Sequence, residues 1–157
     1  MNGRAGRILV VDDVPENVRL LEAMLEGEGY HVVSTTDGLA ALELAVSAKP
    51  DLVLLDVMMP PPDGLAVCRQ LRKQQETAVL PVIMLTASEG SEKTTAIAAG
   101  ADDFIPKPFN RDELLTRIRS LIRIKQYHDT IEAQAAELLD LNRTLEERET
   151  RRNRVDS

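Results

Sequence analysis

Five polar side chains occupy positions from which they could do chemistry together. Asp12 and Asp13 directly follow one short aliphatic run, and Asp56 directly follows another. Thr86 and Lys107 come after two further runs of the same kind. Carboxylates gathered in one place repel one another unless a cation binds, and oxygen ligands favour a hard ion such as Mg²⁺. A carboxylate beside that ion can attack phosphorus, while a lysine and a hydroxyl stabilise the transferring phosphoryl group.

These side chains converge only if the aliphatic runs are parallel strands of one sheet. Each run is too short for a helix, and most are rich in Val, Ile and Leu, which is typical of buried strands. Segments with helical spacing separate them, so the pattern predicts an α/β domain with a doubly wound parallel sheet, commonly of order 2-1-3-4-5. Ligands of such sheets bind beyond the carboxyl ends of the strands. We expect strands at 8–11, 32–34, 52–55, 82–85 and 104–105.

The helices between the strands carry recognisable end signals. Pro15 suits a first helical turn, and Asp37 suits the N-cap of the second helix. A third helix is expected after Gly64, a fourth over 91–99 with Gly100 as its C-cap, and a fifth after Asn110.

The segment 111–150 contains neither Gly nor Pro and predicts one continuous helix, about 60 Å long at 1.5 Å per residue. Beyond its first turns, apolar residues recur every seven positions, as in a coiled coil, at Ile124, Ile131, Leu138 and Leu145. The second row at 3/4 spacing consists of His128, Ala135 and Asn142. Leu141 favours a slipped register, so the register stays open. We expect a homodimer through this helix and a frayed tail at 151–157.

Composition excludes several classes of protein. The formal charge is −7 and only 3% of residues are aromatic, which argues against a nucleic-acid surface. No apolar run is long enough to cross a membrane, and the first residues lack a signal-peptide core. The single cysteine, Cys68, cannot form an internal disulfide, and we expect a cytoplasmic protein with no membrane contact.

Six short motifs follow one another at the predicted strand ends and turns. They are Ile8–Asp13, Leu54–Pro60, Asp63–Gly64, Leu85–Ala87, Gly100–Ala101 and Lys107–Pro108. In this order they resemble the receiver domain of two-component response regulators, over about residues 6–123. The resemblance implies a flavodoxin-like (βα)5 fold. The segment 124–150 forms a helical extension, in which Leu138–Arg148 resembles the connector helices that join receivers to kinase or cyclase output domains.

The resemblance also implies roles for single residues. Asp56 matches the phosphoacceptor, and Asp12 and Asp13 match the acidic pair that holds Mg²⁺, with Asp13 favoured as the direct ligand. Asp56 itself and the backbone carbonyl of Met58 match further Mg²⁺ ligands. Lys107 matches the phosphate-binding lysine, and the family has a cis peptide at the position of the Lys107–Pro108 bond.

Two further positions match the switch residues of the family. Thr86 matches the switch hydroxyl, although a helix-entry cap is an alternative. Phe104 matches the aromatic switch position, although plain core is an alternative. One segment departs from the family pattern, because Pro60, Pro61 and Pro62 stand where a glycine and an apolar residue are usual, which predicts a stiffer loop.

The leading hypothesis is therefore a signalling receiver rather than an enzyme. A histidine kinase or phosphotransfer protein would phosphorylate Asp56, and the long helix would pass the change to a fused or separate output domain. Two alternatives remain. One is a Mg²⁺-dependent phosphohydrolase that forms an aspartyl phosphate on Asp56, and the other is a coiled-coil adaptor whose receiver is inactive.

Overall fold

Five parallel strands form one sheet in the order β2-β1-β3-β4-β5. The computed structural model describes residues 6–87 and 91–156, with the backbone alone for 91–93 and 154–156. The predicted α/β class and strand order are confirmed, and each strand extends one residue beyond its predicted range at one or both ends. The strands are β1 Arg7–Val11, β2 His31–Thr35, β3 Leu52–Asp56, β4 Val82–Thr86 and β5 Asp103–Pro106.

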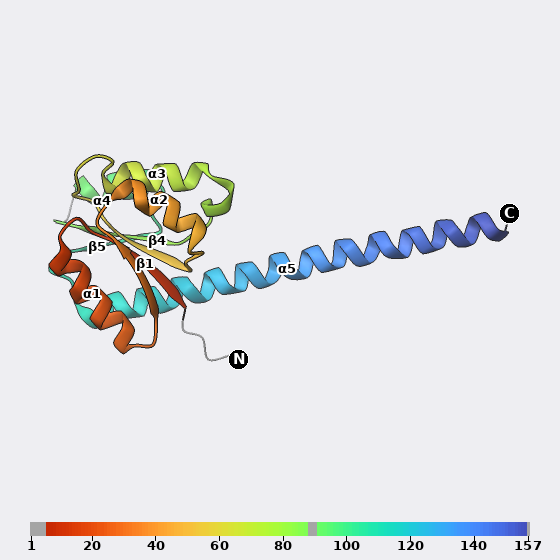
Figure 1. Cartoon of the computed structure of the whole chain (residues 1–157), viewed down its shortest axis with the longest axis horizontal. Coiled ribbons are helices and arrows are strands. Elements are labelled where there is room, and N and C mark those ends of the chain that lie inside the picture. Colours follow the sequence, from red (N-terminus) through yellow and green to blue (C-terminus); the bar gives the residue numbers. More distant parts are fainter. Residues whose placement is uncertain (1–5, 88–90, 157) are drawn as a thin grey trace. The chain divides into compact units, whose positions relative to one another are not determined.

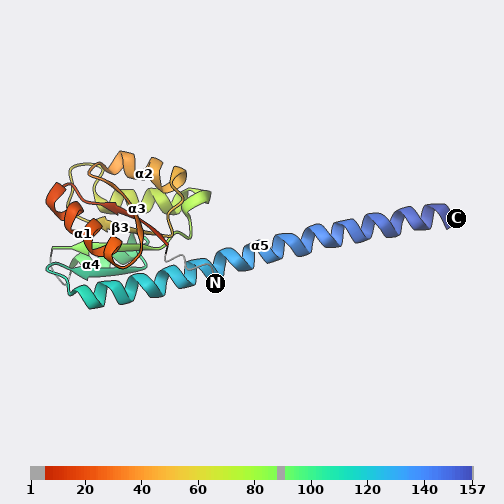
Figure 2. The same ribbon diagram turned by 60° about the horizontal axis from the view of Figure 1, so that its bottom comes forward.

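Helices cover both faces of this sheet (Figures 1 and 2). α2 and α3 lie on one face together with α4, and α1 and the first turns of α5 lie on the other. A short 3₁₀ turn, η1, which the sequence did not predict, follows α3. The helical elements are α1 Pro15–Gly27, α2 Gly38–Ser47, α3 Gly64–Lys73, η1 Gln75–Thr77, α4 Ser91–Ala98 and α5 Arg111–Asp156.

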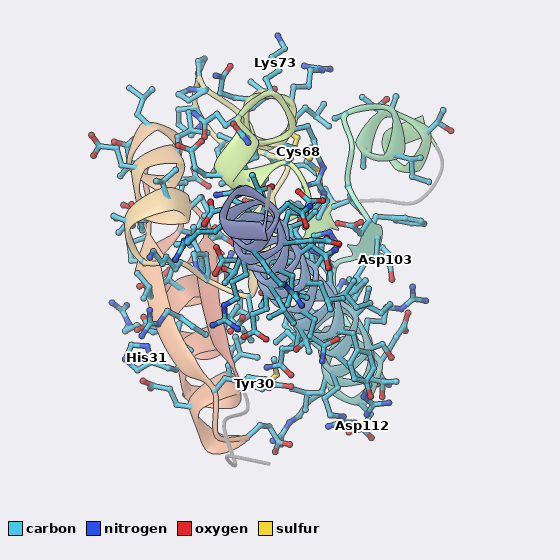
Figure 3. The ribbon with its side chains drawn as sticks, turned by 90° about the vertical axis from the view of Figure 1, so that its right-hand side faces the viewer. Tyr30, His31, Cys68, Lys73, Asp103 and Asp112 are labelled. Atoms are coloured by element: carbon cyan, nitrogen blue, oxygen red, sulfur yellow. The ribbon has the colours of Figure 1, made fainter. Side chains whose placement is uncertain are left out.

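Successive strand residues supply two separate cores because side chains alternate between the faces of a sheet. In β1, Leu9 packs with α2 and α3, whereas Ile8 packs with α1 and α5. The central strands β1 and β3 are buried on both faces, which explains their uninterrupted aliphatic sequence. Figure 3 shows Cys68 on the sheet-facing side of α3, fully buried, and Lys73 pointing outward at its end.

The ends of the helices follow the predicted signals closely. Pro15 is the first residue of α1, and the Asp37 side chain accepts a hydrogen bond from the Leu39 N–H at 3.1 Å. Asp63 caps α3 in the same way, so this helix begins at Gly64 itself. Gly100 ends α4 with a φ of 106°, a conformation that glycine adopts without strain.

The chain divides into two compact units, Met1–Lys125 and Gln126–Ser157, although α5 runs through both. In the first unit α5 contributes buried Leu114, Leu115, Ile118 and Ile122 to the core. The predicted boundaries at 123 and 150 are not tested by this division and stay predictions. A frayed tail was predicted for 151–157. The structure describes these residues as helical as far as Asp156, and Ser157 lies outside the described residues. None of the described helices combines the length and the apolar character that a membrane span requires.

The close approach of α3 to the end of β3 predicts a stability effect. A Cβ atom on Gly64 would lie 2.2 Å from the Asp56 carbonyl oxygen and 2.8 Å from the Val57 Cα. Because both are backbone atoms, Gly64→Ala should lower the free energy of unfolding by about 2 kcal/mol. Urea denaturation of the full chain measures this change.

Gly27→Ala is the matched control. No atom lies within 4 Å of a Cβ built on Gly27, which is the last residue of α1. Alanine there should leave stability unchanged or raise it by up to about 1 kcal/mol, since glycine is a poor helix former. If Gly64→Ala were as stable as this control, the tight contact beneath Asp56 would be refuted.

Candidate functional site

Three carboxylates meet at the carboxyl edge of the sheet, as the sequence predicts. Asp12 and Asp13 follow the last residue of β1, and Asp56 is the last residue of β3, the strand that pairs with β1. One oxygen from each of the three carboxylates lies within 4.8 Å of the others. Asp12 is fully buried and Asp56 is 4% exposed, whereas Asp13 is half-buried. The site therefore has two inner acids and one that reaches toward solvent.

The Lys107 ammonium lies between the two inner acids. Its Nζ is 3.3 Å from Asp12 Oδ2 and 3.4 Å from Asp56 Oδ1. Lys107 directly follows β5, and its backbone N–H donates to the Thr86 carbonyl at 2.7 Å. This bond fixes the start of the Lys107 loop against the end of β4. One cation thus compensates part of the charge of three acids and leaves a strongly negative group.

Asp12 is held by α1 as well as by the lysine. Its Oδ1 accepts from the Val14 N–H at 2.9 Å, and its Oδ2 accepts from Asn17 Nδ2 at 3.2 Å. Asn17 was not among the predicted site residues. Its place in the first turn of a helix that starts at Pro15, just past the acidic pair, is the signal that could have found it.

Burial raises the pKa of the Asp56 carboxyl above 3.8, its ordinary value, and the nearby Asp12 raises it further. Lys107 and the Met58 N–H act in the opposite direction. That N–H donates to Asp56 Oδ1 at 3.2 Å. The raised pKa shows that folding places this carboxylate where its charge is unfavourable, and a bound cation would remove that cost.

The donor set fits Mg²⁺. Three carboxylates offer only oxygen atoms at close range, and Asp13 is open enough to leave room for the waters that Mg²⁺ keeps. Met58 follows Asp56 closely on the same loop, so its backbone lies beside the group. The predicted ligand role of its carbonyl stays a prediction, as do the separate roles of the three acids.

The predicted switch residues lie on the neighbouring strands. Thr86 is the last residue of β4 and is fully buried, and it pairs with Pro106 of β5. Phe104 lies in β5 and packs, half-buried, against the core formed with α2 and α3. Thr86 is thus on the strand that pairs with the strand of Asp56, and Phe104 is on the next strand outward, where a shift of the β4 end would reach both. Their switching roles stay predictions.

A cavity of about 310 Å³ adjoins the acids. Its wall is largely apolar, and Asp12 and Lys107 border it. It lies between α1 and the segment that follows β5. The remaining lining residues are Asn17, Leu20, Leu21, Leu85, Pro108 and Phe109.

The proline-rich loop lies on the same edge of the sheet. The Pro61–Pro62 and Lys107–Pro108 peptide bonds are both cis. The second of these was predicted from the family resemblance and is confirmed, whereas the first was not predicted. The Pro62 carbonyl approaches Gly38 so closely that a Cβ there would lie 2.5 Å from it. The loop therefore packs against the start of α2.

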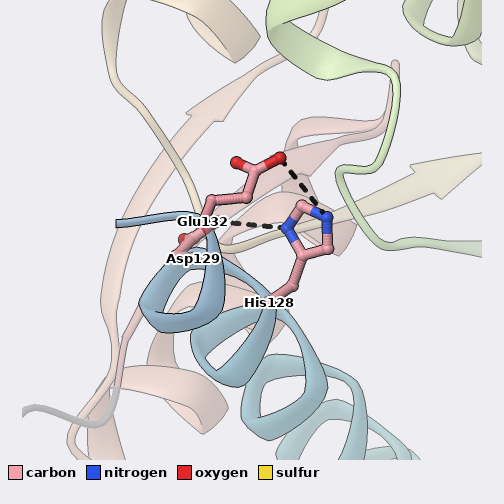
Figure 4. Close-up of side chains that lie close together, drawn as sticks. All are labelled: His128, Asp129 and Glu132. Carbon is pink, nitrogen blue, oxygen red and sulfur yellow. Dashed lines mark ion pairs between the residues drawn. The ribbon is translucent and has the colours of Figure 1, made fainter. Parts of the chain in front are cut away.

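A second group of metal-binding residue types lies on α5 in the second unit (Figure 4). His128 Nε2 is 3.6 Å from Glu132 Oε1, and His128 Nδ1 is 3.8 Å from Asp129 Oδ1. Asp129 and Glu132 are exposed, and all three residues come from little more than one turn of a single helix. This is the arrangement of a solvated helix surface.

Comparison with known proteins decides the family. The family model for the response regulator receiver domain matches residues 8–119. The chain belongs to the response regulator receiver domain family. The chain is 44% identical to the response regulator PleD of Caulobacter vibrioides over 133 residues, 84% of this chain and 29% of PleD. It is 46% identical to the response regulator MprA of Mycobacterium bovis over 136 residues, 86% of this chain and 58% of MprA. This receiver therefore spans only part of each curated relative.

A solved receiver domain has the same fold. The receiver domain of the sensor histidine kinase PA1611 from Pseudomonas aeruginosa shares 34% sequence identity, with a TM-score of 0.70. The match covers 75% of this chain and 98% of that one. That structure is described with a magnesium ion coordinated in its active-site cleft. The alternative of a phosphohydrolase is not favoured by these relationships.

The raised pKa of Asp56 predicts a pH-dependent gain in stability for Asp56→Asn. A carboxyl whose pKa is higher in the folded chain stabilises the fold while protonated, and this contribution is lost as pH rises through the raised pKa. Asparagine stays neutral, so without divalent cations the variant should be more stable at pH 7 by on the order of 1 kcal/mol. The gain should shrink as pH falls toward 3.8.

Urea denaturation in EDTA at both ends of this pH range measures the effect. Asp37→Asn serves as the control because Asp37 is exposed and asparagine also caps helices. It should change stability by less than about 0.5 kcal/mol at either pH. A loss of stability in Asp56→Asn at pH 7 would contradict the electrostatic account of the site.

Proposed function

We propose that Asp56 accepts a phosphoryl group from a phosphohistidine of a histidine kinase or phosphotransfer protein. One observation carries this proposal. The Asp56 carboxylate ends β3 beside Asp12, and the Lys107 ammonium lies 3.4 Å from it. A nucleophile, an acidic metal-binding group and a phosphate-binding cation are thus within reach of one phosphorus atom.

The chemistry is a transfer without net hydrolysis. An oxygen of Asp56 forms a bond to phosphorus while the bond from phosphorus to the donor imidazole nitrogen breaks, and the product is an acyl phosphate. Asp12, Asp13 and Asp56, with the Met58 carbonyl, would hold Mg²⁺, which when bound neutralises charge on the phosphoryl oxygens. Lys107 stabilises the same oxygens, and the Thr86 hydroxyl donates a hydrogen bond to one of them.

The contacts around β4 and β5 offer a route from this site to α5. The Thr86 carbonyl is hydrogen-bonded to the Lys107 N–H, so a movement of the β4 end would displace the loop after β5. Asp103 of β5 forms an ion pair with Arg117 of α5. Ile105 of β5 also shares a core with buried residues of α5. Phosphorylation would therefore change how the first turns of α5 pack on β5. Phe104 would move inward as part of the switch.

We further propose that this chain is part of a cytoplasmic signalling protein and that it forms a homodimer through α5.

The phosphodonor protein would dock near the acids. The cavity beside Asp12 and Lys107 offers an apolar wall for this contact. The second half of α5 would connect the receiver to a fused or separate output domain of kinase or cyclase type. The charge of −7 and the scarcity of aromatic residues support output through protein contacts rather than direct nucleic-acid binding.

Labelling with a small phosphodonor tests the acceptor. Incubation of the full chain with acetyl phosphate and Mg²⁺ should give one acid-stable, base-labile phosphoryl group per chain, detected as a mass increase. Asp56→Asn should reduce this labelling at least 100-fold, because asparagine cannot act as the carboxylate nucleophile. Asp63→Asn, which preserves the cap of α3, should be labelled like the unmodified chain.

The same incubation separates the receiver from the phosphohydrolase and from the inactive adaptor. A receiver gives a stoichiometric adduct, a phosphohydrolase gives continued turnover of organic phosphates, and an inactive adaptor gives no labelling. Undiminished labelling of Asp56→Asn would refute the assignment of the acceptor.

Truncation tests the role of α5. A chain ending at Lys125 retains the first compact unit and should still accept phosphate at Asp56. It should lose the dimer that the full chain forms, as measured by sedimentation at equal concentrations. A truncated chain that remained dimeric would move the interface onto the receiver domain.

A further inference from the structure

The second unit presents a narrow apolar stripe along one side of α5. Its described large hydrophobic side chains are between 50% and 67% exposed, and they are Tyr127, Ile131, Leu138, Leu139, Leu141 and Leu145. At 100° per residue, all of these except Leu139 fall within about 80° of the helix circumference. Gln134 occupies the one remaining position of the stripe. We call these six residues the Tyr127 seam. They are Tyr127, Ile131, Gln134, Leu138, Leu141 and Leu145.

The spacing of the Tyr127 seam alternates between four and three residues over six consecutive positions. This is the a/d repeat of a coiled coil sustained for three heptads, which requires a partner helix with the same period. Ile131, Leu138 and Leu145 then take a positions, and Tyr127, Gln134 and Leu141 take d positions. The sequence spacing alone also offered a second row through His128, Ala135 and Asn142. In the described second unit that row contains no large aliphatic residue.

The charges of the second unit favour a second copy of this helix as the partner. The positions that flank the Tyr127 seam carry a single carboxylate, Glu137, so two copies can approach without opposed rows of like charge. The remaining charges between Tyr127 and Glu147 lie on the outer side of the helix, where they stay solvated. They are Asp129, Glu132, Asp140, Arg143, Glu146 and Glu147.

Gln134 indicates the direction of pairing. In a parallel, in-register pair the two Gln134 side chains meet and can hydrogen-bond to each other. In an antiparallel pair centred on the same seam, each would face Leu138 of the other copy and lose its hydrogen bonds. A buried amide without a partner is costly, and a polar residue at one seam position is a known device for setting register.

We propose that two copies of this chain pair in parallel and in register along the Tyr127 seam, with Gln134 as the polar layer. The inference rests on the proposed dimer and adds its contact residues and direction. Pairing of this kind holds the two C-terminal ends of α5 side by side, so that whatever partner or domain they engage is presented in two adjacent copies.

A matched pair of glutamate substitutions tests the seam in the full chain. Leu139 and Leu141 are 67% and 54% exposed, but only Leu141 belongs to the seam. Leu141→Glu should weaken dimerisation about 100-fold or more, because it places two carboxylates against each other in an apolar layer. Leu139→Glu should change the dimer dissociation constant by less than about threefold. Sedimentation with and without acetyl phosphate and Mg²⁺ gives these constants, and equal phosphorylation of both variants shows that the receiver is folded.

The outcomes separate the seam from the dimer itself. A dimer that is weakened equally by both substitutions, or by neither, overturns the Tyr127 seam and leaves the dimer standing. An unmodified chain that stays monomeric in both phosphorylation states overturns the dimer and the seam together, while labelling of Asp56 remains a separate result.

Disulfide trapping tests direction and register. Cys68 is the single cysteine and is fully buried, so variants are made with Cys68→Ala and also with Cys68 retained. Leu141→Cys should cross-link within the dimer at least tenfold faster than Asn142→Cys under mild oxidation. Faster trapping at Asn142 would assign the row through His128 instead. Cross-links between Ile131→Cys and Leu141→Cys chains, when the two are mixed, would show antiparallel pairing and overturn the proposal.

Discussion

The mutual repulsion of three carboxylates is the interaction on which this receiver depends. Backbone topology forces Asp12 and Asp56 together, because they end adjacent parallel strands and cannot move apart without breaking the sheet. Burial deprives their charges of water, and the pKa of Asp56 rises as a result. Lys107 offsets part of this charge but leaves the site poorly neutralised. The clustered carboxylates raise the electrostatic free energy of the folded chain. A bound cation or a phosphoryl group can therefore change the stability of the fold.

The elements around the acids keep this unfavourable arrangement from relaxing. β1 and β3 are buried on both faces, so the strands that carry the acids are held firmly inside the sheet. Gly64 lets α3 pack directly against the backbone of Asp56. The bond between Lys107 and Thr86 joins the end of β4 to the segment after β5 at the same edge. Charge added to Asp56 would therefore reach β4, β5 and α5 through this bond and through the core that β5 shares with α5.

The second half of α5 follows a different physical rule. It has no sheet to cover, and its apolar side chains remain about half exposed or more. Such a stripe is unfavourable in water unless another surface covers it. Its heptad spacing makes the same helix on a second chain a complementary surface. The receiver thus has an internal core of its own. The second half of α5 would gain a core only by pairing with another helix.

Much of the fold followed from local rules in the sequence. Aliphatic runs gave the strands, and alternation of strands with helices gave the α/β class and the strand order. The caps at Asp37 and Gly100 could be predicted because each depends on a few neighbouring residues. Their places after the aliphatic runs located the acids and Lys107, and the family motifs gave these residues their roles. The cap from Asp63 and the 3₁₀ turn after α3 were missed, since weak local signals allow several backbone conformations.

The sequence by itself determined which charged residues follow the strands and therefore lie at the edge of the sheet. It also determined where along α5 the apolar pattern changes from a face that covers the sheet to a heptad repeat. Only the tertiary structure decided that Lys107 lies between Asp12 and Asp56, and that Asn17 supports Asp12. It also decided how closely α3 approaches Asp56. These contacts join segments far apart in the chain or depend on the packing of whole elements, so no local spacing encodes their distances.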